Sequence, residues 1–253
     1  MSLNQSTDLP YINIVMMSSF DGQARGKYFF YPGGPINALI EFIKELRKMP
    51  HQGEIFGSST IKEACSLENT IDLSKYEKNN VSIPKEDWIS ADKIDNYCFT
   101  FDRKGSLNYK TCNCDLFDYM KCPEKIGVVQ SHMVSILLEN VSNEYLQFLR
   151  EKKVSYIFAG KDAFDFELAL KKMKSLFKVE TVILGGGPTI NEQFYQKDLF
   201  DEVNLLLMPC SGSGEDRTGI FGKGKFVEFD LVDIKKIEGG NIFLRYKRKN
   251  KGN

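Results

Sequence analysis

Three loops of the chain carry glycine, serine and threonine in patterns that can bind a phosphate group. They are FGSST (56–60), FAGKD (158–162) and LGGGPT (184–189), and each follows an apolar, β-rich run and precedes a helical pattern. A helix N-terminus offers unpaired N–H groups, and glycine lets phosphate oxygens approach the backbone. Each loop alone could be a tight turn or a helix cap, and none has the GxGxxG or Walker spacing. Together they predict a phosphorylated cofactor.

A fourth candidate loop is SSFDG (18–22), which follows the first apolar run. Asp21 beside Gly22 is typical of a turn, and its expected place at the same sheet end as the three loops makes it a candidate site residue. The chain has two histidines, no serine in a GxSxG elbow and no cysteine with an obvious local base. This absence of triad chemistry favours a cofactor that carries the reaction.

The six cysteines predict free thiols in a reducing compartment, because no signal peptide precedes them. Three of them fall in TCNCDLFDYMKC (111–122). Zinc could bind there with Cys98 or His132 as a fourth ligand, but the paired CxxC spacing of strong zinc motifs is missing. We therefore expect no metal. The six positions are Cys65, Cys98, Cys112, Cys114, Cys122 and Cys210.

Composition points to a small-molecule ligand. The 253 residues carry 34 basic and 34 acidic side chains, so the formal net charge is zero. This balance removes the usual electrostatic argument for a nucleic-acid or acidic-membrane partner. The start of the chain has no basic region followed by an apolar one, and no apolar run approaches the roughly 20 residues of a membrane helix. We expect a cytoplasmic protein with no membrane or nucleic-acid partner.

Strand and helix patterns alternate along most of the chain, which predicts an α/β fold with a mostly parallel sheet covered by helices on both faces. Two strand-like runs joined by Gly-Gly in 225–249 predict a C-terminal antiparallel hairpin. We expect one domain over 1–253, with a polar, cysteine-containing insertion around 66–124. The expected parallel strands are 11–17, 53–57, 96–101, 125–130, 155–160, 179–187 and 202–209, and the expected helices are 35–49, 59–64, 143–152, 165–177 and 189–197.

The order of these motifs resembles the reductase domain of the riboflavin-biosynthesis deaminase/reductase proteins, a family with the dihydrofolate-reductase-like fold. The resemblance covers most of the chain, with 66–95 and 105–124 outside it. The segments that carry it are PYINIVMMSSFDGQARG (10–26), ELRKMPHQGEIFGSSTIKEA (45–64), YCFTFDRKGSL (97–107), VSYIFAGKDAFDFELALKKM (154–173) and VETVILGGGPTINEQFYQKDLFDEVNLLLMP (179–209).

The resemblance implies NADPH as hydride donor and a homodimer. It implies reduction of the ribosylamino group of 5-amino-6-(5-phosphoribosylamino)uracil to a ribitylamino chain, a step in which the protein mainly aligns the donor and acceptor carbons. Asp21, as catalytic candidate, and Ser19 would contact this pyrimidine substrate. The implied cofactor-binding residues are Ser58 and Thr60 at phosphate or ribose, Arg103 and Lys104 at the 2′-phosphate, Gly160 beside the cofactor, and Gly186, Gly187, Pro188, Thr189 and Ile190 around the pyrophosphate.

Two departures from the family pattern keep other functions open. The family carries Glu immediately before the glycine-rich turn, where Gly185 stands here, and EACSLENTID (63–72) lacks its D-D-P segment. The alternatives are another pyrimidine or pterin reductase on the same fold, including dihydrofolate reductase, or a non-catalytic NADPH-binding protein. Against dihydrofolate reductase, the chain has no Pro-Trp pair after the first loop and no acidic residue early in the helix expected over 35–49.

Overall fold

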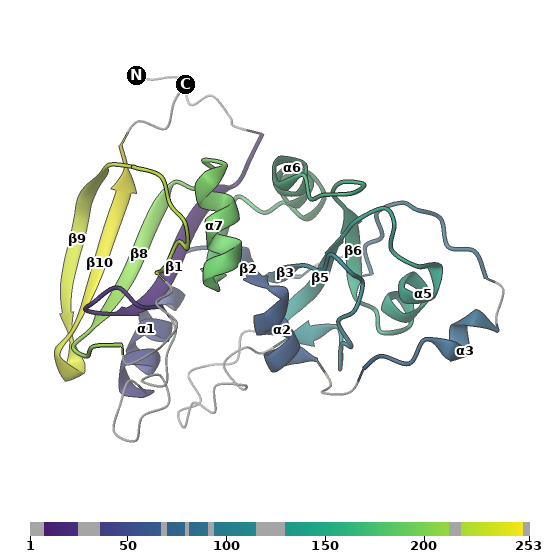
Figure 1. Ribbon diagram of the computed structural model, residues 1–253, viewed down its shortest axis with the longest axis horizontal. Coiled ribbons are helices and arrows are strands. Elements are labelled where there is room, and N and C mark those ends of the chain that lie inside the picture. The colour runs from purple at the N-terminus through teal and green to yellow at the C-terminus, as the bar shows by residue number, and fades with distance from the viewer. Residues whose placement is uncertain are drawn as a thin grey trace.

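The strands of the chain form one mixed sheet. The computed structural model describes residues 8–24, 36–66, 70–78, 81–90, 94–114, 130–212 and 219–249. Within these ranges nine strands follow the order β4-β5-β3-β2-β7-β1-β8-β10-β9, and a tenth, β6, pairs with β5 (Figure 1). The strands are β1 (Tyr11–Ser19), β2 (Gly53–Gly57), β3 (Tyr97–Phe101), β4 (Asn113–Cys114), β5 (Ser131–Leu137), β6 (Ser155–Phe158), β7 (Thr181–Gly186), β8 (Glu202–Met208), β9 (Phe229–Ile237) and β10 (Asn241–Arg248).

Parallel pairing gathers the carboxyl ends of the central strands at one edge of the sheet. β1 pairs in parallel with β7 and β8, β2 with β7 and β3, and β5 with β3 and β6. The register aligns Phe56 of β2 with Gly186 of β7, and Ser19 of β1 with Met208 of β8. The loops that the sequence analysis singled out therefore all leave the sheet from this edge.

Helices cover both faces of the sheet, as the sequence predicts. α6 and α7 bury residues such as Leu170 and Phe194 against one face, where they meet Ile14 and Phe99. α1, α2 and α5 pack on the other face in two further apolar clusters. The helices are α1 (Ile36–Lys48), α2 (Ser58–Cys65), α3 (Ser74–Glu77), α5 (Asn143–Glu151), α6 (Phe166–Phe177) and α7 (Pro188–Gln196), with a 3-10 turn, η2 (Glu238–Gly240).

Local sequence explains where two of these helices begin. The Ser142 side chain accepts a hydrogen bond from the backbone N–H of Tyr145 at the start of α5, and Asp165 does the same for Leu168 at the start of α6. These caps satisfy N–H groups that a helix leaves without an internal partner.

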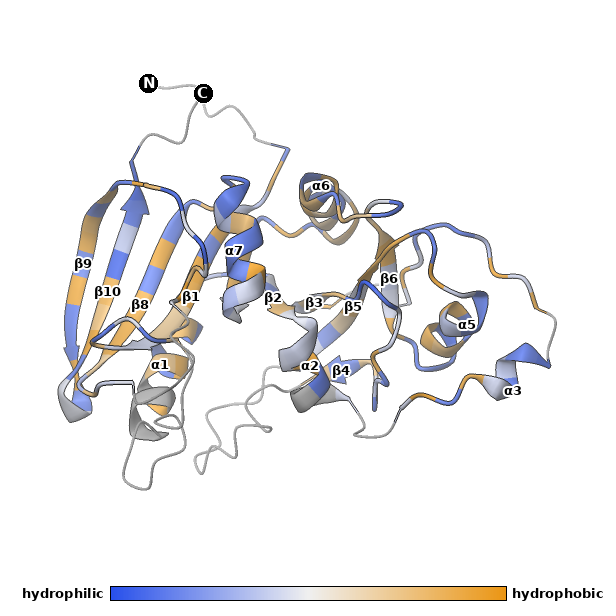
Figure 2. Cartoon of the chain, viewed as in Figure 1, coloured by the Kyte–Doolittle hydropathy of each residue, from blue (hydrophilic) through white to orange (hydrophobic). Residues whose placement is uncertain are grey.

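The C-terminal hairpin is also confirmed. β10 pairs in antiparallel fashion with both β8 and β9, and the turn between β9 and β10 has positive φ angles at Gly239 and Gly240. β9 lies at the end of the strand order, and Figure 2 shows hydrophobic positions along it. Its Leu231 and Ile234 are exposed. Within the described residues, no strand pairs with its outer edge.

One strand of the sheet was not expected from the sequence. Residues 125–129 lie outside the described residues and Gln130 belongs to no strand, whereas β5 (Ser131–Leu137), which the sequence analysis did not expect, is buried along its whole length. Serine and histidine weakened its apolar signal. In the fold, His132 is accommodated as a neutral side chain, since burial lowers its pKa to about 4 and its Nε2 lies 2.9 Å from Ser155 Oγ.

The expectation of free thiols is wrong for Cys114, which is disulfide-bonded. Cys98, Cys112 and Cys210 are free, and Cys122 lies outside the described residues. In the described ranges, no group of three or more histidine, cysteine or acidic side chains is arranged to hold a metal ion. None of the described helices is long and apolar enough to cross a membrane.

Candidate functional site

Two strand-to-helix junctions lie side by side at the carboxyl edge of the sheet. β2 leads directly into α2 with Gly57 at the N-cap, and β7 leads into α7 with Gly187 at the N-cap and Pro188 in the first turn. Among the described residues, no side chain caps either helix. The first N–H groups of both helices are therefore available to an anionic ligand, and their partial positive charge favours one.

A Cβ atom fits beside Gly57. A Cβ atom built on Gly57 lies 3.7 Å from Ile190 Cγ2, 3.8 Å from the Gly187 N atom and 3.9 Å from the Gly186 O atom, all ordinary contact distances. A methyl group would therefore lie between the two junctions without a clash, in contact with both of them. Gly57 lies in a loop that the sequence analysis quoted, but it was not among the predicted site residues.

The glycines before α7 are required by the fold itself. Gly186 has a φ of +88°, and a Cβ there would lie 2.7 Å from the Met16 sulfur. A Cβ on Gly185 would lie 2.2 Å from the ring of Phe56. The Gly186–Gly187 peptide bond is cis. A substitution at Gly185 or Gly186 would therefore disturb the packing of the protein as well as the binding of a ligand.

A buried polar side chain, that of Asn191, lies close to the same glycines. Asn191, in the first turns of α7, is fully buried, and its Nδ2 donates to the carbonyl of Ile220 at 3.1 Å. Its Oδ1 has no hydrogen-bond partner within the described part of the chain. A buried acceptor without a partner is costly and marks a place where a ligand or ordered water can donate. No feature of the sequence identified Asn191 in advance.

The turns after β3 and β6 are joined. Arg103 donates through Nη2 to the carbonyl of Asp162 at 2.9 Å, which brings Arg103 and Lys104 beside the loop that contains Gly160. The turn after β3 is held by buried Asp102, whose carboxylate accepts from the Ser106 N–H and from the Tyr145 hydroxyl. Both Arg103 and Lys104 remain exposed.

Asp21 links the turn after β1 to the loop after β8. Its Oδ1 accepts from the Gly212 N–H at 2.8 Å and from the Ser19 hydroxyl, and its Oδ2 accepts from Gln23 Nε2 at 3.2 Å. The hydrogen bond from Gly212, followed by that from Ser19, holds the pKa of Asp21 below its usual value. At neutral pH Asp21 is thus an exposed, ionised acceptor rather than a proton donor.

The predicted site residues fall into three groups at this edge, and the first is Arg103, Lys104 and Gly160 at the joined turns after β3 and β6. Ser58, Thr60 and the residues from Gly186 to Ile190 surround the paired junctions, whereas Asp21 and Ser19 lie at the end of β1, the strand beside β7. Ser19 is buried and its hydroxyl is engaged with Asp21 and the Gln23 backbone. The arrangement can bind phosphate oxygens through backbone N–H groups and place a carboxylate near a second, polar ligand.

Residues 118–243 match the family described as the RibD C-terminal domain. This segment belongs to that family. It contains β7, α7 and β8, and its match confirms the resemblance found in the sequence. None of the curated proteins compared matches the chain in sequence.

Solved structures show the same fold. A pyrimidine reductase-like protein from Corynebacterium diphtheriae has a TM-score of 0.64 at 15% identity and covers 96% of this chain and 93% of its own. RibD from Acinetobacter baumannii has a TM-score of 0.58 at 19% identity over 96% of this chain, which spans 59% of that protein. Riboflavin biosynthesis reductase Rib7 from Saccharomyces cerevisiae has a TM-score of 0.56 at 11% identity, with 97% and 93% covered.

Proposed function

We propose that the chain is an NADPH-dependent reductase that converts the ribosylamino group of 5-amino-6-(5-phosphoribosylamino)uracil to a ribitylamino group. The observation that carries the proposal is the RibD C-terminal domain match over 118–243, since this segment includes the uncapped α7 junction. The coarser conclusion, a reductase of the riboflavin-biosynthesis type, is supported by the match and by the fold of the solved relatives.

The residues at the paired junctions fit such a cofactor. The open position at Gly57, the uncapped N–H groups of α2 and α7, and the unpartnered Asn191 Oδ1 are all found at one edge. We propose that Gly187 to Ile190 hold the pyrophosphate, that Ser58 and Thr60 bond to phosphate or ribose, and that Arg103 and Lys104 bind the 2′-phosphate. A guanidinium suits a phosphate because it offers several fixed donors.

When bound, NADPH would supply the hydride that C1 of the ribosylamino group accepts. In this proposal the chain's own residues hold the two reactants. Asp21, ionised and fixed by the Gly212 N–H, accepts a hydrogen bond from the substrate and orients it. The Ser19 hydroxyl donates a hydrogen bond to Asp21 Oδ1 and helps to hold this carboxylate in place. Such positioning contributes to rate by removing the entropy cost of alignment.

A titration with NADPH and NADH tests the cofactor half of the proposal. Gly57→Val places two methyl groups beyond a Cβ that already contacts Ile190 and the Gly186–Gly187 backbone, so we expect it to weaken NADPH binding by more than tenfold. Far-UV circular dichroism checks that the variant is folded. Gly57→Ala is the graded control and should show a smaller loss. Unchanged NADPH affinity in Gly57→Val would contradict the proposed cofactor position.

The substrate half is tested by turnover, followed as the loss of NADPH absorbance. We expect oxidation of NADPH with the phosphoribosylaminouracil and not with dihydrofolate. The packing of Phe56 against Gly185 favours a second candidate, because it leaves no room for the glutamate of the family pattern. That candidate is a reductase for a different pyrimidine or a pterin, and it would be supported by turnover with dihydrofolate alone.

We also propose that the protein is a cytoplasmic homodimer, as the family resemblance implies. Light scattering on the purified chain gives its mass directly. A mass of one chain, 28.9 kDa, across the micromolar range would contradict the dimer. NADPH binding without turnover of any pyrimidine or pterin would instead point to a non-catalytic nucleotide-binding protein.

A further inference from the structure

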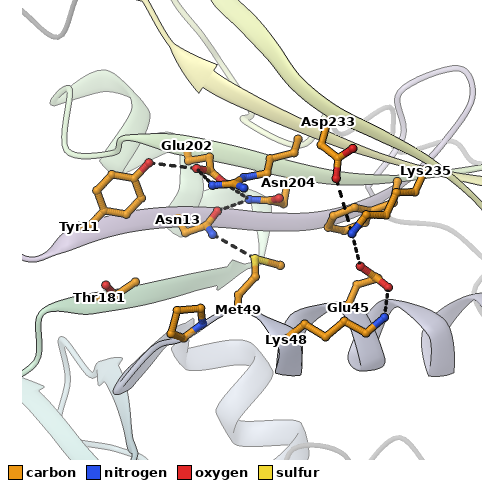
Figure 3. A pocket seen from close by; sticks show the side chains of 13 residues that line it. Tyr11, Asn13, Glu45, Lys48, Met49, Thr181, Glu202, Asn204, Asp233 and Lys235 are labelled. Atoms are coloured by element: carbon orange, nitrogen blue, oxygen red, sulfur yellow. Dashed lines mark hydrogen bonds and ion pairs between the residues drawn. The ribbon is translucent and has the colours of Figure 1, made fainter.

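A pocket of about 330 Å³ lies at the opposite end of the sheet from the candidate cofactor site. It is lined by residues at the amino ends of β1, β7 and β8, by the end of α1, and by β9 and β10 (Figure 3). Its volume is in the range of pockets that hold small molecules. None of its lining residues belongs to the site described above.

The floor of the pocket is a network of polar side chains around the buried Glu202. Glu202 is almost fully buried and forms a two-point ion pair with Arg245, with Nε–Oε1 and Nη2–Oε2 distances of 2.6 and 2.9 Å. Tyr11 donates its hydroxyl to Glu202 Oε2 at 3.0 Å, and Asn204 donates to Glu202 Oε1 at 2.9 Å. Asn204 Nδ2 also donates to Asn13 Oδ1 (Figure 3).

This network leaves one acceptor without a partner. Both bonds of Asn204 use its Nδ2, and their acceptors fix the orientation of the amide, so Oδ1 cannot be exchanged with Nδ2 without losing them. Within the described residues Asn204 Oδ1 has no partner, although the side chain is fully buried. A ligand that donates a hydrogen bond there would remove the cost of an unsatisfied polar atom.

The charges around the pocket cancel. Three cationic and three acidic side chains line it, and they are already paired with one another: Glu202 with Arg245, and Glu45 with both Lys48 and Lys235. An ionic ligand would have to displace one of these pairs. A neutral ligand would not.

The remaining lining is apolar or carries hydroxyl groups. Met49, Pro50 and Phe243 offer surface for a flat ring, while Tyr11 and Thr181 offer hydroxyl oxygens that can pair with ligand hydroxyls. A ring with N–H donors joined to a sugar combines these features in one uncharged molecule. We propose that this pocket binds a neutral nucleoside, with the N–H edge of the base on Asn204 and the sugar beside Tyr11 and Thr181.

Calorimetric titration of the full chain with uridine, uracil and ribose tests this proposal. We expect one uridine per chain with a dissociation constant below 1 mM, and at least tenfold weaker binding of ribose or uracil alone. Met49→Trp should fill the pocket and abolish uridine binding, and Tyr11→Phe should weaken it several-fold. Lys236→Trp, on the opposite side of β9 and outside the pocket lining, is the control and should bind like the wild type.

The outcome is independent of the proposed reductase activity, because each variant is also titrated with NADPH. Loss of uridine binding in Met49→Trp with NADPH binding retained supports the pocket. Absence of uridine binding in the wild type, equal binding of ribose, or binding that survives both Met49→Trp and Tyr11→Phe would overturn it. If Met49→Trp does not fold, Tyr11→Phe decides. It removes one hydroxyl, which also donates to Glu202, and retained NADPH binding shows that the variant is folded.

Discussion

The two ends of the sheet use different kinds of chemical group. At the carboxyl edge, the candidate site is formed mostly by the backbone. Its parts are two helix N-termini, Gly186 with a positive φ, and Gly57, where a Cβ would fit. At the amino end, long polar side chains meet around the buried Glu202 carboxylate. Changes at the carboxyl edge therefore act through shape, whereas changes at the amino end act through charge and desolvation.

The largest effect on stability is expected from Arg245→Leu. The variant leaves the buried Glu202 carboxylate without its cation. Because the Arg245 side chain is itself 47% exposed, we expect the lower end of the cost of breaking a buried pair, about 3 kcal/mol. Chemical denaturation at pH 7 measures the loss. Lys247→Leu, two residues along β10 and exposed, is the matched control and should change stability by less than about 0.5 kcal/mol. Equal stability of the two variants would remove the distinction between the ends of the sheet.

The stability loss in Arg245→Leu should depend on pH. Burial raises the pKa of Glu202, but hydrogen bonds from Arg245 and Asn204 outweigh it, so the folded-state pKa lies below its usual value. The ion pair thus contributes fully above the unfolded pKa of about 4.3, and its contribution is lost as pH falls through the folded value. The stability gap between wild type and Arg245→Leu should narrow below about pH 4.

Gly186→Ala should have the next largest effect. Its Cβ would meet the Met16 sulfur in a backbone conformation that L-residues disfavour, so we expect a loss of about 2 kcal/mol. Gly57→Ala should leave stability within about 0.5 kcal/mol, since its Cβ has room. Thermal or urea unfolding distinguishes the two. If Gly57→Ala is the less stable, the gap at the paired junctions is smaller than these contacts indicate.

Asp21→Asn should alter catalysis without altering its pH profile. Hydrogen bonds from Gly212 and Ser19 lower the pKa of Asp21. Asp21 therefore stays ionised throughout the range from pH 5 to 8. We expect a lower kcat in the variant and profiles of the same shape across this range. A wild-type ionisation between pH 5 and 8 that Asp21→Asn abolishes would make Asp21 a proton-transfer group instead.

The smallest stability effect is expected from Arg103→Gln. Arg103 is exposed and makes one hydrogen bond to the Asp162 carbonyl, so stability should change by less than about 0.5 kcal/mol. If Arg103 binds the 2′-phosphate, NADPH affinity should fall roughly tenfold while NADH affinity is unchanged. Parallel titrations measure the ratio. A similar loss for both cofactors would assign Arg103 to the turn rather than to the phosphate.

Strand-to-helix alternation could be predicted because it rests on local signals. The apolar run before Gly186 and the proline at the first position of α7 were visible in the sequence and gave the junction correctly. β5 was missed because it contains serine and histidine, which are uncommon in a fully buried strand. Their burial depends on the helices that cover both faces of the sheet, and these are not visible in the local sequence. The disulfide of Cys114 was missed because cysteine pairing depends on tertiary distance.

The polar network could not be predicted for a related reason. Glu202 and Arg245 resemble ordinary charged residues of exposed strands. Only the antiparallel register, which sets Arg245 opposite Asn204, brings the guanidinium to Glu202. The open position at Gly57 also depends on two strands meeting, since it is defined by atoms of Gly186, Gly187 and Ile190.

The central place of β1 has a consequence for biosynthesis. Its partners are β7 and β8, and the bond between the Ile12 N–H and Asp201 spans 189 positions. At synthesis rates of about 5–20 residues per second, β1 waits roughly 8–35 s on the ribosome before β7, the first of its partners, has been made. During that interval an apolar strand has no native neighbour, so nascent chains of this protein should depend on a holding chaperone until the last third emerges.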